Sequence, residues 1–218
     1  MKSILIISMG EFGQHLAEKM TDLGNHVVIV DKDESIVSEL AEKIPDAFVG
    51  DASKPGVLRS VGVNNFDICF VSVGDNFFAS LEITSYLKEL GAKHVVTKAD
   101  GDRQSEFLKN VGADEVVYPE KDAAEKLAIQ YNADNIFDNY QLSNDYSIYE
   151  VAILPEWIGK SISDLDIRNS YKTNILAVKN KGKINPNPGA KYVFKAGDHI
   201  VVIGKSREVF KLVNYKRK

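Results

Sequence analysis

The chain has 218 residues and a net charge of -4, enough for one large core or two modest ones. This charge gives no reason to expect a nucleic-acid partner, because proteins that bind nucleic acid usually present a basic face. The single cysteine, Cys69, excludes an intramolecular disulfide framework, and its apolar surroundings indicate a small buried side chain. No apolar run approaches the ~20 residues of a membrane span, and no signal peptide precedes the first strand. We therefore expect a soluble, cytoplasmic protein.

The stretch from Ile4 to Asp31 has the pattern of a nucleotide-binding turn. Uninterrupted apolar runs at residues 4–7 and 27–30 predict two parallel strands buried on both faces. Between them, Gly10 would let a ligand approach the backbone, and Gly13 would let the next helix pack close to the strand. Asp31 ends the second strand about 20 residues after the glycines, where a ribose is normally held. Ser8 replaces the first glycine of G-x-G-x-x-G and can still fit if its φ is negative. The alternative is an ordinary strand–turn–helix without a ligand.

Helices and strands then alternate along the chain. The first helix is expected to bury a face formed by Phe12, Leu16, Met20 and Leu23 and to offer free N–H groups to a phosphate. Further helices are expected over 34–43, from an N-cap at Ser53 through Leu58, along 81–90 and through 107–108, and further strands over 47–50, 68–73, 95–99 and 115–119. This alternation predicts an α/β fold with a doubly wound, parallel, Rossmann-like sheet. Its ligand crevice would lie at the carboxyl ends of the strands, where residues 8–13, Asp31, Asp51, Gly74 and Lys98 fall.

The remainder of the chain has a different character. A helical pattern runs from Glu120 to Tyr131, and residues 136–142 then carry more apolar surface than a linker needs, which suggests packing on a second subunit. Strands at 149–154, 174–178, 193 and 200–203, with short helices at 163–165 and from Ser206, predict a small α+β lobe. We therefore expect a Rossmann-like N-lobe over 1–130, a helical crossover over 131–145 and a C-lobe over 146–218. No grouping of nucleophile, base and oxyanion donor is found in the second half, which argues against an enzyme.

The whole chain resembles the RCK (regulator of potassium conductance) family, the cytoplasmic regulators of bacterial Ktr/Trk-type potassium uptake systems. In the first half the resemblance rests on MGEFG (9–13), GDAS (50–53), VGDN (73–76), VTKA (96–99) and GADEVVYPEKD (112–122). In the second half it rests on LDIR (165–168), ILAVK (175–179) and FKAGD (194–198). The resemblance implies a homodimer that assembles into an octameric ring. It further implies that the ring docks on a membrane pore subunit at the inner face of the cell membrane and gates it when nucleotides exchange.

The same resemblance implies roles for individual residues toward NAD(H), ATP or ADP. The nucleotide-binding set is Ser8, Met9, Gly10, Glu11, Phe12, Gly13, Asp31, Lys32, Asp51, Ala52, Val73, Gly74, Asn76, Lys98 and Glu120. Residues 10, 11 and 13 would face the phosphates, Asp31 the ribose, residues 51–52 the adenine, and Lys98 the phosphate edge. Glu120 would reach a neighbour's nucleotide site, in some relatives through a divalent cation such as Mg²⁺ or Ca²⁺. The alternatives are a solvated strand end for Lys98 and an N-terminal helix acid for Glu120.

Two further expectations follow from this resemblance. Glu11 stands where an arginine is common, which weakens the expectation of triphosphate recognition. In the C-lobe, Arg168, Asn174 and Ile175, with Pro186 or Pro188 as an apolar wall, match the position at which some relatives bind cyclic di-AMP. The alternative is that Arg168 holds an acidic neighbour and that Ile175 belongs half to the core.

Two other classes of protein compete with a nucleotide-sensing gating subunit. A small NAD(P)-dependent reductase would need a catalytic base in the second half, and none is evident. A dinucleotide-sensing transcriptional repressor would need a helix-turn-helix and a basic face, and neither is apparent. Nucleotide binding without turnover, by a ring-shaped assembly, distinguishes the gating subunit from both.

Overall fold

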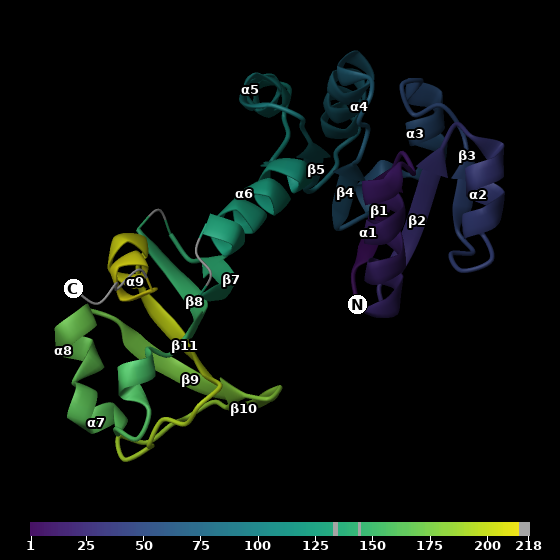
Figure 1. Ribbon diagram of the computed structural model, residues 1–218. Coiled ribbons are helices and arrows are strands. Elements are labelled where there is room, and N and C mark those ends of the chain that lie inside the picture. The colour runs from purple at the N-terminus through teal and green to yellow at the C-terminus, as the bar shows by residue number, and fades with distance from the viewer. Residues whose placement is uncertain (133–134, 144, 214–218) are drawn as a thin grey trace. The chain divides into compact units, whose positions relative to one another are not determined.

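The computed structural model describes residues 1–132, 135–143 and 145–213, which form two compact units, Met1–Asp122 and Ala123–Lys218 (Figure 1). The first unit is an α/β domain whose elements run β1 (Ser3–Ile7), α1 (Glu11–Asp22), β2 (His26–Asp31), α2 (Glu34–Leu40), β3 (Ala47–Val49), α3 (Pro55–Val61), η1 (Val63–Asn65), β4 (Ile68–Val71), α4 (Phe77–Glu89), β5 (Val95–Lys98), α5 (Asp102–Asn110), β6 (Glu115–Val117) and the start of α6 (Pro119–Asn132).

The six strands pair in parallel in the order β3-β2-β1-β4-β5-β6, which confirms the doubly wound sheet. The order reverses between β1 and β4, and in such sheets ligands bind at this reversal, beyond the carboxyl ends of the strands.

Both faces of this sheet are covered by helices. Along β1, Ile4 and Ile6 pack with α1 and α2 in one core cluster, whereas Leu5 and Ile7 pack with α3 and α4 in another (Figure 1). Successive side chains of a strand point to opposite faces, so a strand covered on both sides needs an uninterrupted apolar run. This explains why the sequence pattern identified β1 and β2 correctly.

Two local expectations in this unit are wrong. The helix α1 buries Gly13 and Ala17 and partly buries Leu16 and Met20, but it ends at Asp22, so Leu23 is 66% exposed. Ser53 does not cap a helix either, because α3 begins at Pro55 and has Lys54 in the N-cap position. The Ser53 hydroxyl instead donates to Asp51 Oδ1 at 2.7 Å.

The second unit is the expected small α+β lobe. Its elements after α6 are β7 (Ile136–Gln141), β8 (Tyr146–Ala152), η2 (Pro155–Trp157), α7 (Ile162–Leu165), α8 (Ile167–Tyr171), β9 (Asn174–Asn180), β10 (Lys183–Asn185), β11 (Asp198–Lys205) and α9 (Ser206–Val213). The strands form an antiparallel sheet in the order β10-β9-β11-β8-β7. Trp157, Tyr149 and Phe194 are the largest fully buried side chains of its core, and α9 contributes Val209 and Leu212.

The connection between the lobes differs from the expected helical crossover over 131–145. Residues 136–141 are the edge strand β7, which pairs with β8, and Phe137 stacks on His199 with ring centroids 4.0 Å apart. A helical structure for this stretch is therefore wrong, because the backbone of residues 136–141 pairs with β8. Val193, expected in a strand, forms an isolated bridge with Ser161. The division between the units falls inside α6, at residues 122 and 123, and not at residue 130.

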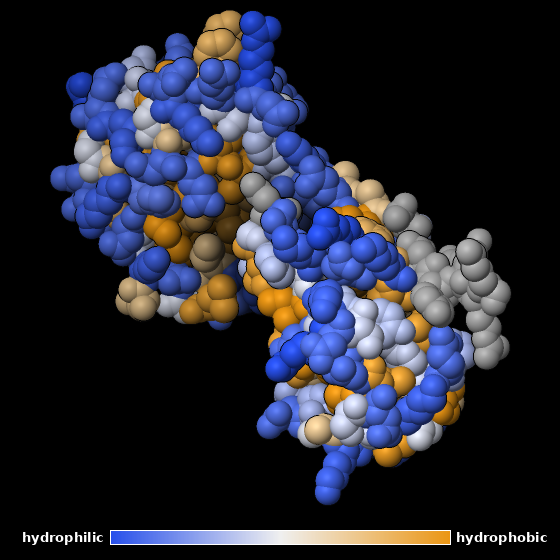
Figure 2. Space-filling view, turned by 90° about the vertical axis from the view of Figure 1, so that its left-hand side faces the viewer, coloured by the Kyte–Doolittle hydropathy of each residue, from blue (hydrophilic) through white to orange (hydrophobic). Residues whose placement is uncertain are grey.

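Some features of the surface and interior bear on function. No helix among the described residues is long and apolar enough to cross a membrane. Cys69 is buried, as expected, and burial raises the pKa of its thiol to about 12. The surface is largely hydrophilic, but large apolar side chains reach it, as the space-filling view illustrates (Figure 2). Among the most exposed are Phe78 in the first unit and Tyr131 and Tyr140 in the second.

Candidate functional site

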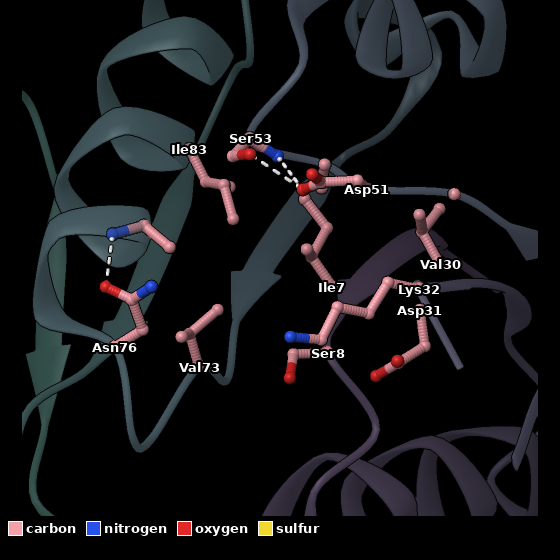
Figure 3. A pocket seen from close by; sticks show the side chains of 13 residues that line it. Ile7, Ser8, Val30, Asp31, Lys32, Asp51, Ser53, Val73, Asn76 and Ile83 are labelled. Atoms are coloured by element: carbon pink, nitrogen blue, oxygen red, sulfur yellow. Dashed lines mark hydrogen bonds between the residues drawn. The ribbon is translucent and has the colours of Figure 1, made fainter.

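A cavity of about 210 Å³ lies at the carboxyl ends of β1, β2 and β3 and against the start of α4 (Figure 3). It therefore occupies the position that the sheet order predicts for a ligand. The residues that line it are Ile7, Ser8, Val30, Asp31, Lys32, Gly50, Asp51, Ala52, Ser53, Val73, Asn76, Ala79 and Ile83.

Asp31 links the end of β2 to the turn after β1. One carboxylate oxygen accepts a hydrogen bond from the Met9 backbone N–H, and the other accepts from the Asp33 backbone N–H at 2.9 Å. These bonds hold the carboxylate at the cavity wall. A carboxylate oxygen has room for more than one hydrogen bond, so Asp31 can still accept from ligand hydroxyls.

The backbone of the turn is strained at Ser8. Its φ of 75° lies in the left-handed region, so the condition under which serine was expected to fit, a negative φ, is not met. Surrounding hydrogen bonds fix this conformation: Ser8 N–H donates to the Val30 carbonyl at 2.9 Å, and the Ser72 hydroxyl donates to the Ser8 carbonyl. A left-handed non-glycine residue costs roughly 1–2 kcal/mol. The sequence therefore retains the glycine-type turn at this position without the glycine.

The two glycines of the turn, Gly10 and Gly13, differ in what a side chain at each position would contact. A Cβ on Gly13 would lie 2.2 Å from the Ser8 carbonyl oxygen and 2.6 Å from the Ser72 hydroxyl, so α1 packs against the turn only because this residue is glycine. A Cβ on Gly10 would meet nothing within 4 Å, and its φ is -65°. No contact within the described part of the chain explains Gly10, whereas a ligand that approaches the backbone would.

The other turn residues do not line the cavity. Met9 is fully buried in the core under α1, Phe12 is half-buried, and the Glu11 side chain is 98% exposed with His15 3.9 Å away. Gly10 occupies the N-cap position of α1 and supplies no side-chain hydrogen bond. The first N–H groups of α1 therefore have no side-chain cap, and such groups are suited to hold a phosphate.

The far wall of the cavity comes from Asp51 and α4. The Asp51 carboxylate accepts from the Ser53 hydroxyl and, at 3.1 Å, from the Ser53 backbone N–H. The Ser53 hydroxyl is the main cause of a lowered Asp51 pKa, against the opposing effect of burial. Asn76 caps α4 by accepting from the Ala79 N–H at 3.1 Å. Lys32 extends toward Ser8 and brings a positive charge to the mouth of the cavity (Figure 3).

Lys98 and Glu120 belong to a second hollow, of about 320 Å³, which they share with Gly74, Asp75, Ala99, Asp100, Tyr118 and Lys121. The Lys98 side chain is only 12% exposed, and its ammonium lies 2.8 Å from Glu120 and 3.4 Å from Asp100. A solvated strand end is therefore excluded for Lys98. Burial disfavours its charge, but the hydrogen bonds and the attraction of the two carboxylates outweigh burial and raise its pKa.

Glu120 is both an acid at the start of α6 and the partner of Lys98. The hydrogen bond from Lys98 is the main cause of its lowered pKa. No group of three potential metal ligands occurs among the residues that the structure describes.

Sequence reasoning found Ala52 and Val73 but missed the part of the apolar wall that α4 supplies. Ala79 and Ile83 follow Asn76 at positions i+3 and i+7 of α4, so the same helix face that carries Asn76 carries them. The helical spacing from Asn76 could have predicted both residues from the sequence. By contrast, nothing in the sequence pattern predicts that Gly74 and Lys98 line a second hollow and not the main cavity.

The C-terminal unit contains a pocket of about 420 Å³ that brings Arg168, Asn174, Ile175 and Pro188 together, whereas Pro186 does not line it. Arg168 donates to Asn174 Oδ1 at 2.9 Å, and the nearby Asp166 carboxylate accepts from Asn169 instead. The alternative in which Arg168 holds its acidic neighbour is therefore not observed. Thr173, which also lines the pocket, is 2% exposed, and its hydroxyl has no partner within the described ranges.

The sheet order and the turn after β1 define a Rossmann-type nucleotide-binding domain followed by a small α+β lobe. Family models match both parts: the TrkA-N domain at residues 4–119 and the TrkA-C domain at residues 147–216. The chain is 34% identical over 208 residues to the Ktr system potassium uptake protein C of Bacillus subtilis (95% of this chain, 94% of the relative). It is 31% identical over 213 residues to protein A of the same system (98% of this chain, 96% of the relative). The chain therefore belongs to the family of Ktr and Trk potassium uptake proteins that carry a TrkA-N and a TrkA-C domain, as the sequence motifs indicated.

Solved structures confirm the RCK fold. The structure described as the GsuK channel matches with a TM-score of 0.72 and 18% identity, over 100% of this chain and 40% of that chain. The structure described as the GsuK channel bound to NAD matches with a TM-score of 0.53 and 21% identity, over 97% of this chain and 38% of that chain. At these identities the likeness concerns the fold, and the chain spans less than half of either channel chain.

Proposed function

We propose that the chain is a cytoplasmic, nucleotide-sensing gating subunit of a potassium uptake system and that it is not an enzyme. The observation that carries this proposal is the cavity at the reversal of the strand order, with Asp31 at its wall, in a chain of the Ktr and Trk family. The subunit docks on a membrane pore protein, and nucleotide exchange in the cavity changes the state of the pore.

The geometry supports one orientation of an adenine nucleotide. Asp31 accepts from the ribose hydroxyls, Asp51 and Ala52 lie beside the adenine, and the N-terminus of α1 faces the phosphates. Val73, Gly74 and Asn76 run along the ligand, with Lys98 at the far phosphate edge. A divalent cation would be held by phosphate oxygens together with Glu120.

Either NAD(H) or ATP and ADP fit this description. The GsuK structure bound to NAD supports a dinucleotide. The exposed carboxylate of Glu11, in the first turn of α1, repels a γ-phosphate and supports weak discrimination between ATP and ADP.

We further infer that the subunit forms homodimers that build an octameric ring. Exposed apolar side chains on α6 and in the stretch through β7 support such an interface, namely Leu127, Tyr131, Tyr140 and Leu142. Light scattering on the purified protein measures the mass of the particle. Replacement of Tyr131 and Tyr140 by Asp should reduce that mass, and an unchanged mass would remove this surface from the interface.

The pocket around Arg168 supports cyclic di-AMP as a second ligand. It offers a guanidinium for a phosphate, an amide for a base edge and the aliphatic surface of Ile175 and Pro188. The Thr173 hydroxyl, which has no partner among the described residues, supplies a further polar group. Isothermal titration of the full chain should show binding that Arg168→Ala abolishes and that a control variant outside the pocket, Lys191→Ala, retains. The absence of heat with a folded protein would remove this site.

Titration of the purified protein with NAD, NADH, ADP and ATP tests the main proposal. At least one nucleotide should bind, and Gly10→Ala should weaken it by tenfold or more at a cost of less than about 1 kcal/mol in stability, because its Cβ would enter only the space assigned to the ligand. The absorbance at 340 nm of bound NADH should stay constant with candidate substrates. Cofactor turnover would instead favour a reductase.

A further inference from the structure

A groove of about 520 Å³ on the second unit has an unusual distribution of charge. It lies between the β9–β10 hairpin and the loop that leads into β11. From Asn174 to Asp198, every charged residue except Asp198 is a lysine. Three of them, Lys181, Lys183 and Lys195, line the groove. Within the described part of the chain, none of the three has a carboxylate within 4.0 Å of its ammonium. The groove therefore carries positive charge that the unit does not neutralise.

The one carboxylate at the groove is used internally. Asp198 is 2% exposed and accepts hydrogen bonds from the Tyr192 hydroxyl at 2.9 Å, from the Lys195 backbone N–H at 2.8 Å and from the Asn180 amide. These bonds tie the loop before β11 to β9. The wall of the groove is thus held in place, and the single charge of Asp198 leaves most of the positive charge of the three lysines uncompensated.

The groove lies beside an open strand edge. β10 is the outermost strand of its sheet and pairs only with β9 among the described strands. The hairpin turn consists of Lys181 and Gly182, with φ values of 47° and 77°, as in a type I′ turn. Asn180 and Lys183 close this turn, so Ile184 occupies the next, non-hydrogen-bonded position opposite Lys179. Its N–H and C=O therefore point away from β9 to the open edge, and its side chain is 61% exposed.

We propose that this groove binds an extended segment of a partner protein that is rich in Asp and Glu. The segment adds to the sheet beside β10, pairs with the backbone of Ile184 and places its carboxylates against Lys181, Lys183 and Lys195. Alternate side chains of an added strand point to the same side, so carboxylates at every second position face the lysines. Two copies of this basic edge repel each other, which argues against self-pairing, and a compact anion would not use the open backbone.

Fluorescence anisotropy with the full-length protein and a labelled (Glu-Thr)₅ peptide tests the charge. Saturable binding is expected, and Lys181→Glu with Lys183→Glu should weaken it by tenfold or more. The control is Lys160→Glu with Lys191→Glu, an equal charge change at exposed lysines outside the groove, and it should change affinity by less than about twofold. If both double variants lost the same affinity for the peptide, the overall charge of the protein would explain the effect, and the proposal would be overturned.

The backbone is tested separately. Ile184→Pro removes the outward N–H without removing a bond to β9 and should abolish binding, whereas Ile184→Val should retain it. A (Glu-Thr)₅ peptide that is N-methylated at every second residue tests the same bonds without altering the protein. Full affinity for the methylated peptide would overturn strand addition. So would binding of pyrophosphate or of phosphatidylglycerol vesicles at the same lysines without binding of the peptide.

Discussion

Ser8 shows how a single residue can keep a motif's geometry without its usual amino acid. The turn holds Ser8 at a φ of 75° through hydrogen bonds from its own N–H to Val30 and from Ser72 to its carbonyl. Ser8→Gly removes the strain of roughly 1–2 kcal/mol but adds unfolded-state entropy of about 0.4–1 kcal/mol. We expect a net stabilisation of up to about 1.5 kcal/mol, measured by urea unfolding. Ser8→Ala keeps the Cβ and should give no gain, and a gain from both variants would contradict the assignment of strain.

Asp31 makes a specific prediction about cofactor choice. Its carboxylate is held at the cavity wall by two backbone N–H groups, so it cannot turn away from a ligand without losing both bonds. A 2′-phosphate would meet this charge at close range, where a like-charge pair costs roughly 4 kcal/mol before screening. Calorimetry should therefore show NADP binding at least tenfold more weakly than NAD. Equal affinities would show that Asp31 does not face the ribose.

At the scale of elements, the contact between β1 and α1 depends on one glycine. Gly13→Ala would place its Cβ 2.2 Å from the Ser8 carbonyl, a backbone atom that cannot move without displacing the turn. We expect a loss of more than about 2 kcal/mol of stability, as is typical of overpacking against backbone. Gly10→Ala is the matched control in the same turn and should cost less than about 1 kcal/mol. Similar costs for the two would contradict the close approach of α1.

The sheet of the second unit contains a partly buried charge cluster that makes stability depend on pH. The Glu150 side chain is 15% exposed and accepts hydrogen bonds from Lys179 at 2.8 Å and His199 at 3.0 Å. Burial raises the pKa of Glu150, but these bonds and charges outweigh burial and lower it below its usual range. A lowered folded-state pKa contributes stability above the unfolded value of about 4.3, and that stability is lost as the pH falls through the folded value.

Glu150→Gln should therefore lower the urea midpoint at pH 7 by an amount equivalent to about 1–3 kcal/mol. The difference from the wild type should shrink as the pH falls below the unfolded value of about 4.3, because the unfolded wild-type carboxylate then binds protons that the folded one still excludes. Glu39→Gln, at an exposed position on α2, should have little effect at either pH. An undiminished difference at pH 3.5 would contradict a role for the charge.

The sequence pattern predicts some elements of this fold correctly and others not. Strands β1, β2 and β5 are short, buried runs covered on both faces, so the sequence pattern identified them, and the polar residues at the ends of β1 and β2 located the cavity. Strand β7 could not be predicted from the sequence, because Ile136, Phe137 and Tyr140 fit a helical and an extended pattern equally well. Pairing with β8 makes this stretch a strand. The φ of Ser8 could not be predicted from the sequence either, because hydrogen bonds from Ser72, just after β4, help to impose it.

At the scale of the whole molecule, the chain combines a nucleotide cavity in one unit with a polar pocket and a basic groove in the other. Each of the three offers charged or polar groups to a ligand or partner. Membership in the Ktr and Trk family supports the proposal that these sites serve the control of a potassium pore.

Potassium flux into liposomes that contain the pore subunit from the same organism tests this account most directly. We expect that added full-length chain changes the rate of ⁸⁶Rb⁺ uptake and that exchanging one bound nucleotide for another, such as ADP for ATP or NAD for NADH, shifts that rate by several fold. Gly10→Ala, which leaves the fold intact, should abolish the nucleotide dependence while the subunit still binds the liposomes. Uptake that is the same with and without the chain, or the same with every nucleotide, would contradict the account.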